Sequence, residues 1–259
     1  MSGILFDEII FGPLQSRRFG VSLGINLLPL DSKLCSFNCV YCECGLTDHA
    51  KGHKPRLFTR EQILGSLEQR FIGLHGNHVI PDSITFAGNG EPTMHPEFES
   101  IIDGVVELRD EYFPQAMITV LSNATQLNRD SVRSALGKVD NNVLKLDAGT
   151  DALFQAINRP LNKITLEEVV KRLVDFEGDL TIQTLFVRGK VHEGFVDNTL
   201  ETEIIPWLGF LERISPKLVM LYPIDRRTPY TSLEKITEAE LASIAGRVEK
   251  IGLKAEIFS

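Results

Sequence analysis

Long hydrophobic runs are missing from this chain of 259 residues, although 43% of its residues are hydrophobic. No stretch stays apolar over the roughly 20 residues that a membrane-spanning helix needs, so we expect no membrane span. The first residues also lack the basic region and the apolar core of a secretory signal. Because the few thiols are clustered and no export signal is seen, the sequence predicts a protein of the reducing cytoplasm.

Basic residues are fewer than acidic ones, with 27 Lys and Arg against 35 Asp and Glu and a formal net charge of −8. Proteins that grip the phosphate backbone of nucleic acids need clustered Lys and Arg, so the balance disfavours a nucleic-acid partner. Internal repeats, low-complexity tracts and Pro/Ser-rich linkers are also absent. We therefore expect one domain over residues 1–259, with a lead at 1–20, a core at 21–225 and an extension at 226–259.

Cysteine is scarce, and all four cysteines lie between residues 35 and 44. Cys35, Cys39 and Cys42 form a C-x3-C-x2-C run, with Tyr41 directly before its last member. Three thiolates at this spacing can bind three irons of a 4Fe–4S cube and leave the fourth iron open to chelate a small molecule. We predict that these three cysteines are the metal ligands and that Cys44 is a spare thiol beside them.

A structural zinc site and a disulfide framework are the other common uses of clustered cysteines. Zinc sites usually draw on two C-x2-C knuckles about a dozen or more residues apart, whereas Cys44 follows Cys42 in a C-x-C. A chain of this length can build its core without disulfides, and cysteines this close would close only tiny loops. The pattern favours the cluster and leaves zinc as the alternative.

Short apolar runs alternate with helical patterns along the chain. We expect strands at 21–28, 83–88, 116–122, 142–147, 180–187 and 217–222, with a weaker one at 253–258. Capping boxes that begin at Thr59, Thr165 and Thr237 predict the starts of three helices, each followed by an apolar stripe. Buried strands separated by helices are typical of βα units around a parallel sheet. This predicts an α/β fold, either a partial barrel or an open doubly wound sheet.

Polar residues stand at the ends of several predicted strands. They are Asn89, Gly90 and Glu91 after the second strand, Ser122 and Asn123 at the end of the third, and Lys145 and Asp147 on the fourth. Glycine lets a backbone approach a ligand closely, and Glu91 supplies a carboxylate for a cationic group. Lys145 and Asp147 alternate with leucines, so both point to one side of the strand. Plain turns and a salt bridge at the rim are the structural interpretations of the same residues.

The cysteine run with Tyr41 resembles the signature of the radical S-adenosylmethionine (SAM) enzymes. Gly88–Thr93 resembles that family's Gly-Gly-Glu-Pro motif, with Asn89 in place of one glycine. The lead Gly12-Pro-Leu-Gln-Ser-Arg-Arg-Phe-Gly20 resembles that of a radical SAM group related to the wyosine (tRNA-modifying) synthases. The resemblance covers nearly the whole chain as an order of elements, but its specific motifs occupy only residues 12–45 and 88–96.

The resemblance implies a partial (β/α)6 TIM-like barrel with mostly parallel strands, in which sites gather at the carboxyl ends of the strands. It implies a 4Fe–4S cluster on the three cysteines, and SAM whose amino group is held by Glu91 and whose adenine lies near Tyr41. Ser122, Asn123, Lys145 and Asp147 are then candidates for its ribose and carboxylate. The implied reaction is reductive cleavage of SAM to a 5′-deoxyadenosyl radical that abstracts hydrogen from a substrate. A flavodoxin or ferredoxin would supply the electron.

Three features bear on the substrate. The archaeal wyosine synthases carry a second cluster on upstream cysteines, and no cysteine precedes Cys35 here; with the acidic net charge, this argues against tRNA. Arg17 and Arg18 in the lead are candidates to contact a phosphate or the carboxylate of SAM, with a solvated hairpin as the structural interpretation of the same residues. Basic residues in the loops His49–Arg56 and Asp225–Tyr230 favour a substrate that bears carboxylate or phosphate. An activating enzyme for a glycyl-radical partner and a non-enzymatic zinc or iron–sulfur binding protein are the alternative functions.

Overall fold

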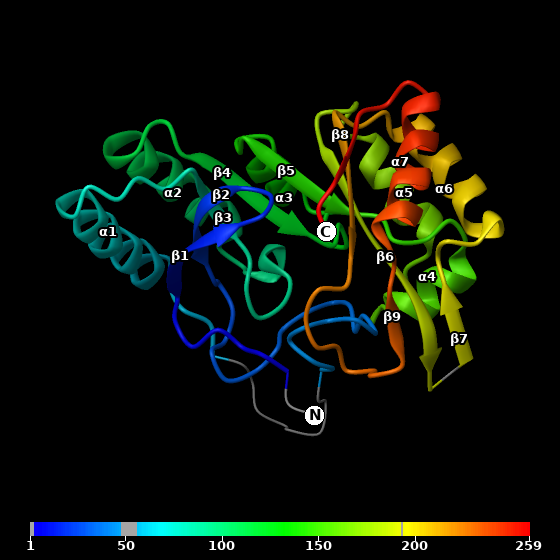
Figure 1. Cartoon of the computed structure of the whole chain (residues 1–259). Coiled ribbons are helices and arrows are strands. Elements are labelled where there is room, and N and C mark those ends of the chain that lie inside the picture. The colour runs from blue at the N-terminus through cyan, green and yellow to red at the C-terminus, as the bar shows by residue number, and fades with distance from the viewer. Residues whose placement is uncertain (1–2, 48–55, 193) are drawn as a thin grey trace.

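The computed structural model describes residues 3–47, 56–192 and 194–259, which form one sheet with helices packed around it (Figure 1). The strands are β1 (Ile10–Ser16), β2 (Gly20–Ile25), β3 (Ser83–Phe86), β4 (Met117–Ser122), β5 (Asn141–Lys145), β6 (Thr181–Val191), β7 (Gly194–Asp197), β8 (Leu218–Pro223), β9 (Leu233–Lys235) and β10 (Ala255–Ile257). The helices are α1 (Arg60–Gly76), the 3-10 turn η2 (Pro92–Met94), α2 (Phe98–Tyr112), α3 (Asp130–Leu136), α4 (Asp151–Ile157), α5 (Leu166–Val174), α6 (Glu201–Ile214) and α7 (Glu238–Lys250).

The sheet runs in the order β1-β2-β3-β4-β5-β6-β8-β10. From β2 to β10 every pair along this path is parallel, and at least one helix lies between successive strands. β1 pairs antiparallel with β2, and the path does not close, so that β1 and β10 are its two ends. The predicted α/β fold with a mostly parallel sheet that stops short of a closed barrel is confirmed, and so is the weak strand predicted at 253–258.

Two antiparallel additions were not among the predicted strands, although a hairpin was the structural interpretation of the lead. The lead forms β1 and a tight turn into β2, so residues 10–25 are a hairpin. The strand expected at 180–187 continues to Val191, and this extension pairs with β7 and β9. Both additions lie outside the βα repeat, which is why the periodic pattern did not reveal them.

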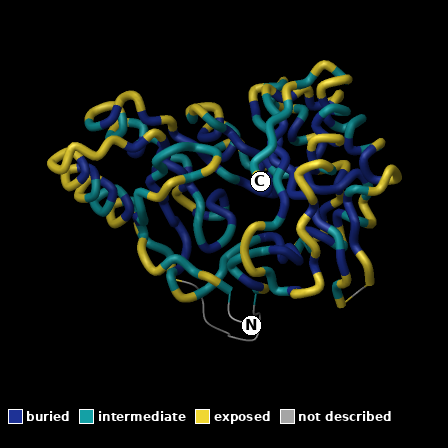
Figure 2. Tube along the Cα trace, in the orientation of Figure 1, coloured by how far each residue is buried: buried dark blue, intermediate teal, exposed yellow. Residues whose placement is uncertain are grey.

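The core lies between the sheet and the inner faces of the helices, where the trace is dark in Figure 2. All four residues of β3 are buried, as expected for a strand covered on both faces. On α1 the buried residues Ile63, Leu67, Phe71 and Leu74 recur at helical spacing. Each such side chain contributes roughly 1.5–3 kcal/mol on burial. None of the helices in the described ranges is long and apolar enough to cross a membrane.

All three predicted helix starts are confirmed by reciprocal hydrogen bonds. Thr59, Thr165 and Thr237 each accept a bond from a residue three positions on, whose side chain bonds back to the threonine amide. α6 was missed because it has no such start signal and contains Pro206, a residue that sequence patterns read as a helix breaker.

Glu240 of α7 forms an ion pair with Arg188 of β6, and we expect its protonation to change the stability of the fold. Hydrogen bonds from Thr237 and from the Arg188 guanidinium lower the pKa of Glu240 to about 2 from an ordinary 4.5. Because the folded-state pKa is depressed, this stabilisation is present above pH 4.5 and is lost as the pH falls toward 2. We expect thermal unfolding scans across this window to show a shallower loss of Tm in Glu240→Gln than in the wild type. Equal slopes would contradict this role.

Candidate active site

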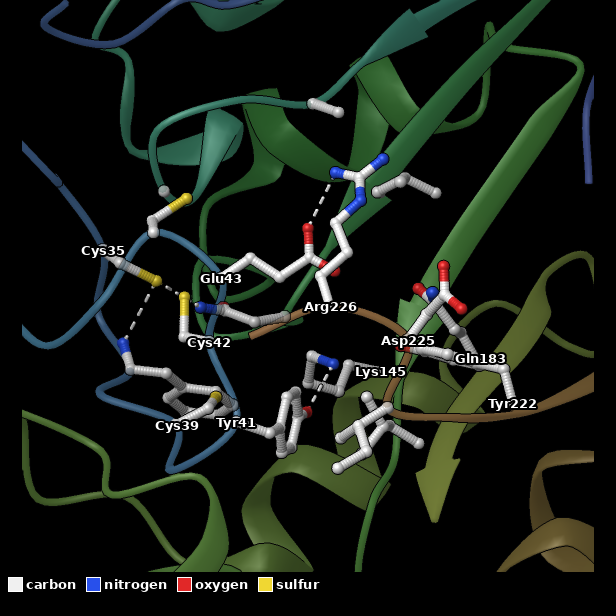
Figure 3. Close-up of a pocket in the computed structure, with 18 of the residues that line it drawn as sticks. Cys35, Cys39, Tyr41, Cys42, Glu43, Lys145, Gln183, Tyr222, Asp225 and Arg226 are labelled. Carbon is white, nitrogen blue, oxygen red and sulfur yellow. Dashed lines mark hydrogen bonds and ion pairs between the residues drawn. The ribbon is translucent and has the colours of Figure 1, made fainter. Parts of the chain in front are cut away.

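A cavity of about 320 Å³ lies where the carboxyl ends of the parallel strands meet the loop that carries the cysteines. We call it the cysteine pocket. Its walls include Cys35, Cys39, Cys42, Glu91, Lys145 and Tyr222. Figure 3 shows the cysteine side chains on one side of this pocket and Gln183, Tyr222 and Asp225 on the other.

The four cysteines are free thiols, and all of them line the pocket. Cys35 Sγ accepts from the amide of Phe37 (3.4 Å) and from Asn123 Nδ2 (3.6 Å). Burial raises the pKa of Cys35 to about 12, and it also raises that of Cys39. A hydrogen bond from Cys44 lowers the pKa of Cys42 to about 5. The buried sulfurs therefore need a bound cation to hold all three as thiolates.

The donor set fits an iron–sulfur cluster by its chemistry. Cys35, Cys39 and Cys42 are free thiols that line one cavity, and each thiolate of a cube-type cluster binds a different iron. In the part of the chain that the structure describes, no three His, Cys, Asp or Glu side chains form a group that could hold a single metal ion.

Glu91 ties the end of β3 to the end of β4. Its carboxylate accepts hydrogen bonds from the amide (3.1 Å) and hydroxyl (2.5 Å) of Thr93, from Ser122 Oγ (2.8 Å) and from the amide of Asn123 (2.6 Å). The residue is only 2% exposed. Burial raises the pKa of Glu91, although these hydrogen bonds act to lower it. Glu91, Ser122 and Asn123 all line the pocket, so three predicted site residues form one rigid unit there.

Gly90 and Asn89 serve the backbone around the pocket. A Cβ on Gly90 would lie 1.8 Å from the carbonyl oxygen of Leu34, and its φ of +144° is unfavourable for other residues. The glycine thus allows the cysteine loop to pair with the chain after β3, through Leu34 N to Asn89 O (2.9 Å) and Glu91 N to Leu34 O (3.0 Å). The Asn89 side chain does not line the pocket, where we had expected it to contact SAM. Its amide bonds the backbone of Phe6 and the carbonyl of Pro29 instead.

Lys145 and Tyr41 line the pocket, while Asp147 lies behind them. Lys145 Nζ donates to Tyr41 Oη (2.8 Å) and lies 3.5 Å from Asp147 Oδ2, to which the Tyr41 hydroxyl also donates. Burial alone would lower the pKa of Lys145, but the negative charge of Asp147 has the larger combined effect with the other neighbours, so the pKa of Lys145 is raised. Burial also raises the pKa of Tyr41, which keeps the phenol neutral. Asp147 therefore positions a charged lysine and a neutral tyrosine, and the lysine lies close enough to Cys39 for its charge to oppose the burial that raises the pKa of that thiol.

Sequence reasoning missed several residues of the site. Asn158 donates to Asp147 Oδ2 (2.7 Å) and to Cys39 Sγ (3.6 Å), which links the lysine network to a predicted ligand. Lys33 donates to Gly45 O (2.9 Å), and the charges of Cys42, Cys35 and Cys39 outweigh burial and raise its pKa. Lys33 could have been predicted as a site residue from its position two residues before Cys35. Asn158 stands in no motif.

Of the two loops that we expected to contact substrate, the structure describes only the second in full. Residues 48–55, with His49, Lys51 and Lys54, lie outside the described residues; Arg56 is exposed. The loop after β8 does reach the pocket through residues 224–226 and Thr228. Arg226 pairs with Glu43 (2.9 Å) there, and Asp225 pairs with Arg17 (3.1 Å).

Known proteins resemble this chain in sequence. A "UPF0026 protein" of Synechocystis sp. is 33% identical over 227 residues, which cover 85% of this chain and 77% of that protein. Another from Methanocaldococcus jannaschii is 33% identical over 212 residues, 80% of this chain and 61% of that protein. A "GTPase Obg" of Brachyspira hyodysenteriae is 27% identical over 236 residues, 90% of this chain. The chain spans 32% of this last relative's length, and no protein-family model matches it.

Solved structures resemble it in fold. A radical SAM methyltransferase from Sphaerobacter thermophilus superposes with a TM-score of 0.67 at 14% identity, over 91% of this chain and 65% of that one. Archaeal TYW1 gives 0.56 at 14% identity, over 88% and 71% of the two chains. The enzyme anSMEcpe with bound AdoMet gives 0.56 at 13% identity, over 91% and 64%. The chain belongs to the UPF0026 family and has the fold of the radical SAM enzymes.

Proposed function

We propose that this protein is a radical SAM enzyme, in which Cys35, Cys39 and Cys42 hold a 4Fe–4S cluster and the rest of the cysteine pocket holds SAM and substrate. The observation that carries the proposal is the meeting of three cysteines with strand-end residues Glu91 and Lys145 in one cavity of a radical SAM fold. When bound, the cluster and SAM supply a 5′-deoxyadenosyl radical that abstracts a hydrogen atom from the substrate. A flavodoxin or ferredoxin is the proposed electron donor.

The pocket offers a partner for each polar part of SAM. The anchored Glu91 carboxylate suits the ammonium group, and the charged Lys145 suits the carboxylate. Ser122 and Asn123 present polar atoms for the ribose, while Tyr41 fixes the loop against which adenine would lie. Asp147 and Asn89 act indirectly, because their side chains bond the protein rather than face the cavity.

Glu91→Ala should weaken SAM binding by about tenfold or more, the usual effect of losing a charge-assisted hydrogen bond. Equilibrium titration of SAM into the reconstituted protein measures this effect, and iron content should stay at the wild-type level. Glu107→Ala, on the outer face of α2, removes a matched carboxylate and should change neither quantity. Unchanged SAM affinity in Glu91→Ala would reduce residues 88–93 to a structural turn.

For the substrate we propose only a class. The lead Gly12–Gly20 and the fold shared with archaeal TYW1 support a place in the group related to wyosine synthases. The net charge of −8 disfavours tRNA as substrate. The solved neighbour SuiB is bound to a precursor peptide, which supports a protein or peptide substrate, such as a glycyl-radical partner, as the second candidate. We further propose that residues 1–259 act as one cytoplasmic domain.

Metal analysis after anaerobic reconstitution tests the cofactor. The proposal predicts about four iron and four sulfide per chain. About one zinc per chain, with no sulfide, would favour the non-enzymatic zinc-binding alternative.

A further inference from the structure

The basic side chains of the cysteine pocket differ in whether another group of the protein already pairs with them. The pocket is lined by Arg17, Arg18, Lys33, Lys145 and Arg226. Arg17 and Arg226 pair with Asp225 and Glu43, Lys33 donates to the carbonyl of Gly45, and Lys145 pairs with Asp147. Arg18 is different: within the described ranges its Nη1 is buried and has no hydrogen-bond partner.

Two aromatic rings contact the Arg18 guanidinium but accept no hydrogen bond from its Nη1. Its central carbon lies 5.3 Å from the ring centre of Tyr222 and 5.3 Å from that of Phe19. Stacking of this kind fixes the plane of the guanidinium but supplies no acceptor in that plane. Burial lowers the pKa of Arg18, yet an arginine stays charged in proteins. A charged guanidinium with a buried, unused donor is costly, and an anion in the pocket would remove that cost.

Arg18 lies over the ring of Tyr222, and Glu43, which follows Cys42 on the cysteine loop, is a charged neighbour. Tyr222 also lies close enough to Lys145 and Cys39 for their charges to act on its pKa. Tyr222 stands across the pocket from the cysteines in Figure 3, beside Gln183, which also lines it.

The open sheet explains how a residue before β2 reaches this place. Arg18 stands in the turn between β1 and β2, near one end of the sheet path, and the loop after β8 comes from the other end. The Arg17–Asp225 ion pair joins the two across the pocket. A molecule in the pocket can therefore contact both the cysteine loop and Arg18.

Resting on the radical SAM function above, we infer that Arg18 binds an anionic group, a carboxylate or a phosphate, of the substrate. The planar fork of a guanidinium matches either group with two parallel hydrogen bonds. Tyr222 adds a neutral polar group beside it, and Gln183 lines the same pocket. Arg226, which we had expected to select an anionic substrate, is already neutralised by Glu43.

The test uses inorganic phosphate and acetate as probes. Each is titrated, with ligand-observed NMR as the readout, into reconstituted protein saturated with SAM. We expect the wild type to bind at least one probe, and Arg18→Gln to weaken that binding by about tenfold or more. Arg226→Gln removes the same charge from the same pocket and should weaken it by less than about threefold, because its partner Glu43 already offsets that charge. The preferred probe tells phosphate from carboxylate.

Three results would overturn the inference: no probe binding by the wild type, equal binding by Arg18→Gln, or a tenfold loss of SAM affinity in Arg18→Gln. The last would assign Arg18 to the SAM carboxylate. If Arg18→Gln does not fold, Arg18→Lys keeps the charge but loses the fork, and it should still weaken probe binding by about threefold or more. Failure of the radical SAM function would appear separately, as missing iron, and probe binding by the cluster-free protein would still report on Arg18.

Discussion

Alanine in place of Cys35, Cys39 or Cys42 is expected to abolish iron binding, the brown absorbance of the cluster and all SAM cleavage. Each thiolate would hold a different iron, and alanine offers no ligand in its place. The chain has four cysteines and all of them line the pocket, so Cys44 is the one other thiol that could replace a lost ligand. Iron and sulfide content of the reconstituted variants measures the effect directly.

Cys44→Ala is the matched control. The Cys44 thiol bonds Cys42 and the carbonyl oxygen of Gly88 (3.4 Å), which makes it a neighbour of the ligand set. We expect this variant to keep nearly all of its iron. Loss of the cluster in Cys44→Ala, together with retention in one of the other three variants, would show that the ligands are assigned wrongly.

Asp147→Ala should lower the free energy of unfolding by about 3–5 kcal/mol, the usual result of breaking a buried ion pair on one side. The Asp147 side chain has 0% exposure and accepts from Asn158 Nδ2 (2.7 Å) and from the amide of Leu185 (3.0 Å). Its loss would leave these donors unsatisfied and Lys145 charged without its partner. Urea denaturation followed by circular dichroism measures the change.

Asp103→Ala breaks an exposed ion pair with Lys138 and provides the comparison. Pairs of this kind contribute about 0–1 kcal/mol, so this variant should resemble the wild type. If both variants lose the same small amount, the network behind the pocket does not support the fold as described here.

The sequence predicted those parts of the molecule that depend on local patterns. Short apolar runs predicted the strands, three capping boxes predicted the starts of α1, α5 and α7, and successive parallel strands are neighbours in the sheet. Strand-end residues such as Glu91 and Lys145 could then be placed at one rim before the structure was known. Their presence in the cysteine pocket agrees with that prediction.

The remaining parts of the site depend on contacts between distant segments. Asn158 reaches Asp147 and Cys39 from the end of α4, with no motif around it. Arg18 reaches the pocket only because a hairpin turn at one end of the sheet meets a loop from the other. The direction of Asn89 depends on Phe6 and Pro29, far away in sequence. Sequence periodicity carries no information on such encounters.

The most direct test of the central claim is an assay for 5′-deoxyadenosine after anaerobic reconstitution with iron and sulfide, in the presence of SAM and a low-potential reductant. We expect the wild type to form 5′-deoxyadenosine and Cys42→Ala to form none. A wild type that holds a full complement of iron and sulfide, binds SAM and yet leaves it intact under reducing conditions would contradict a radical SAM function.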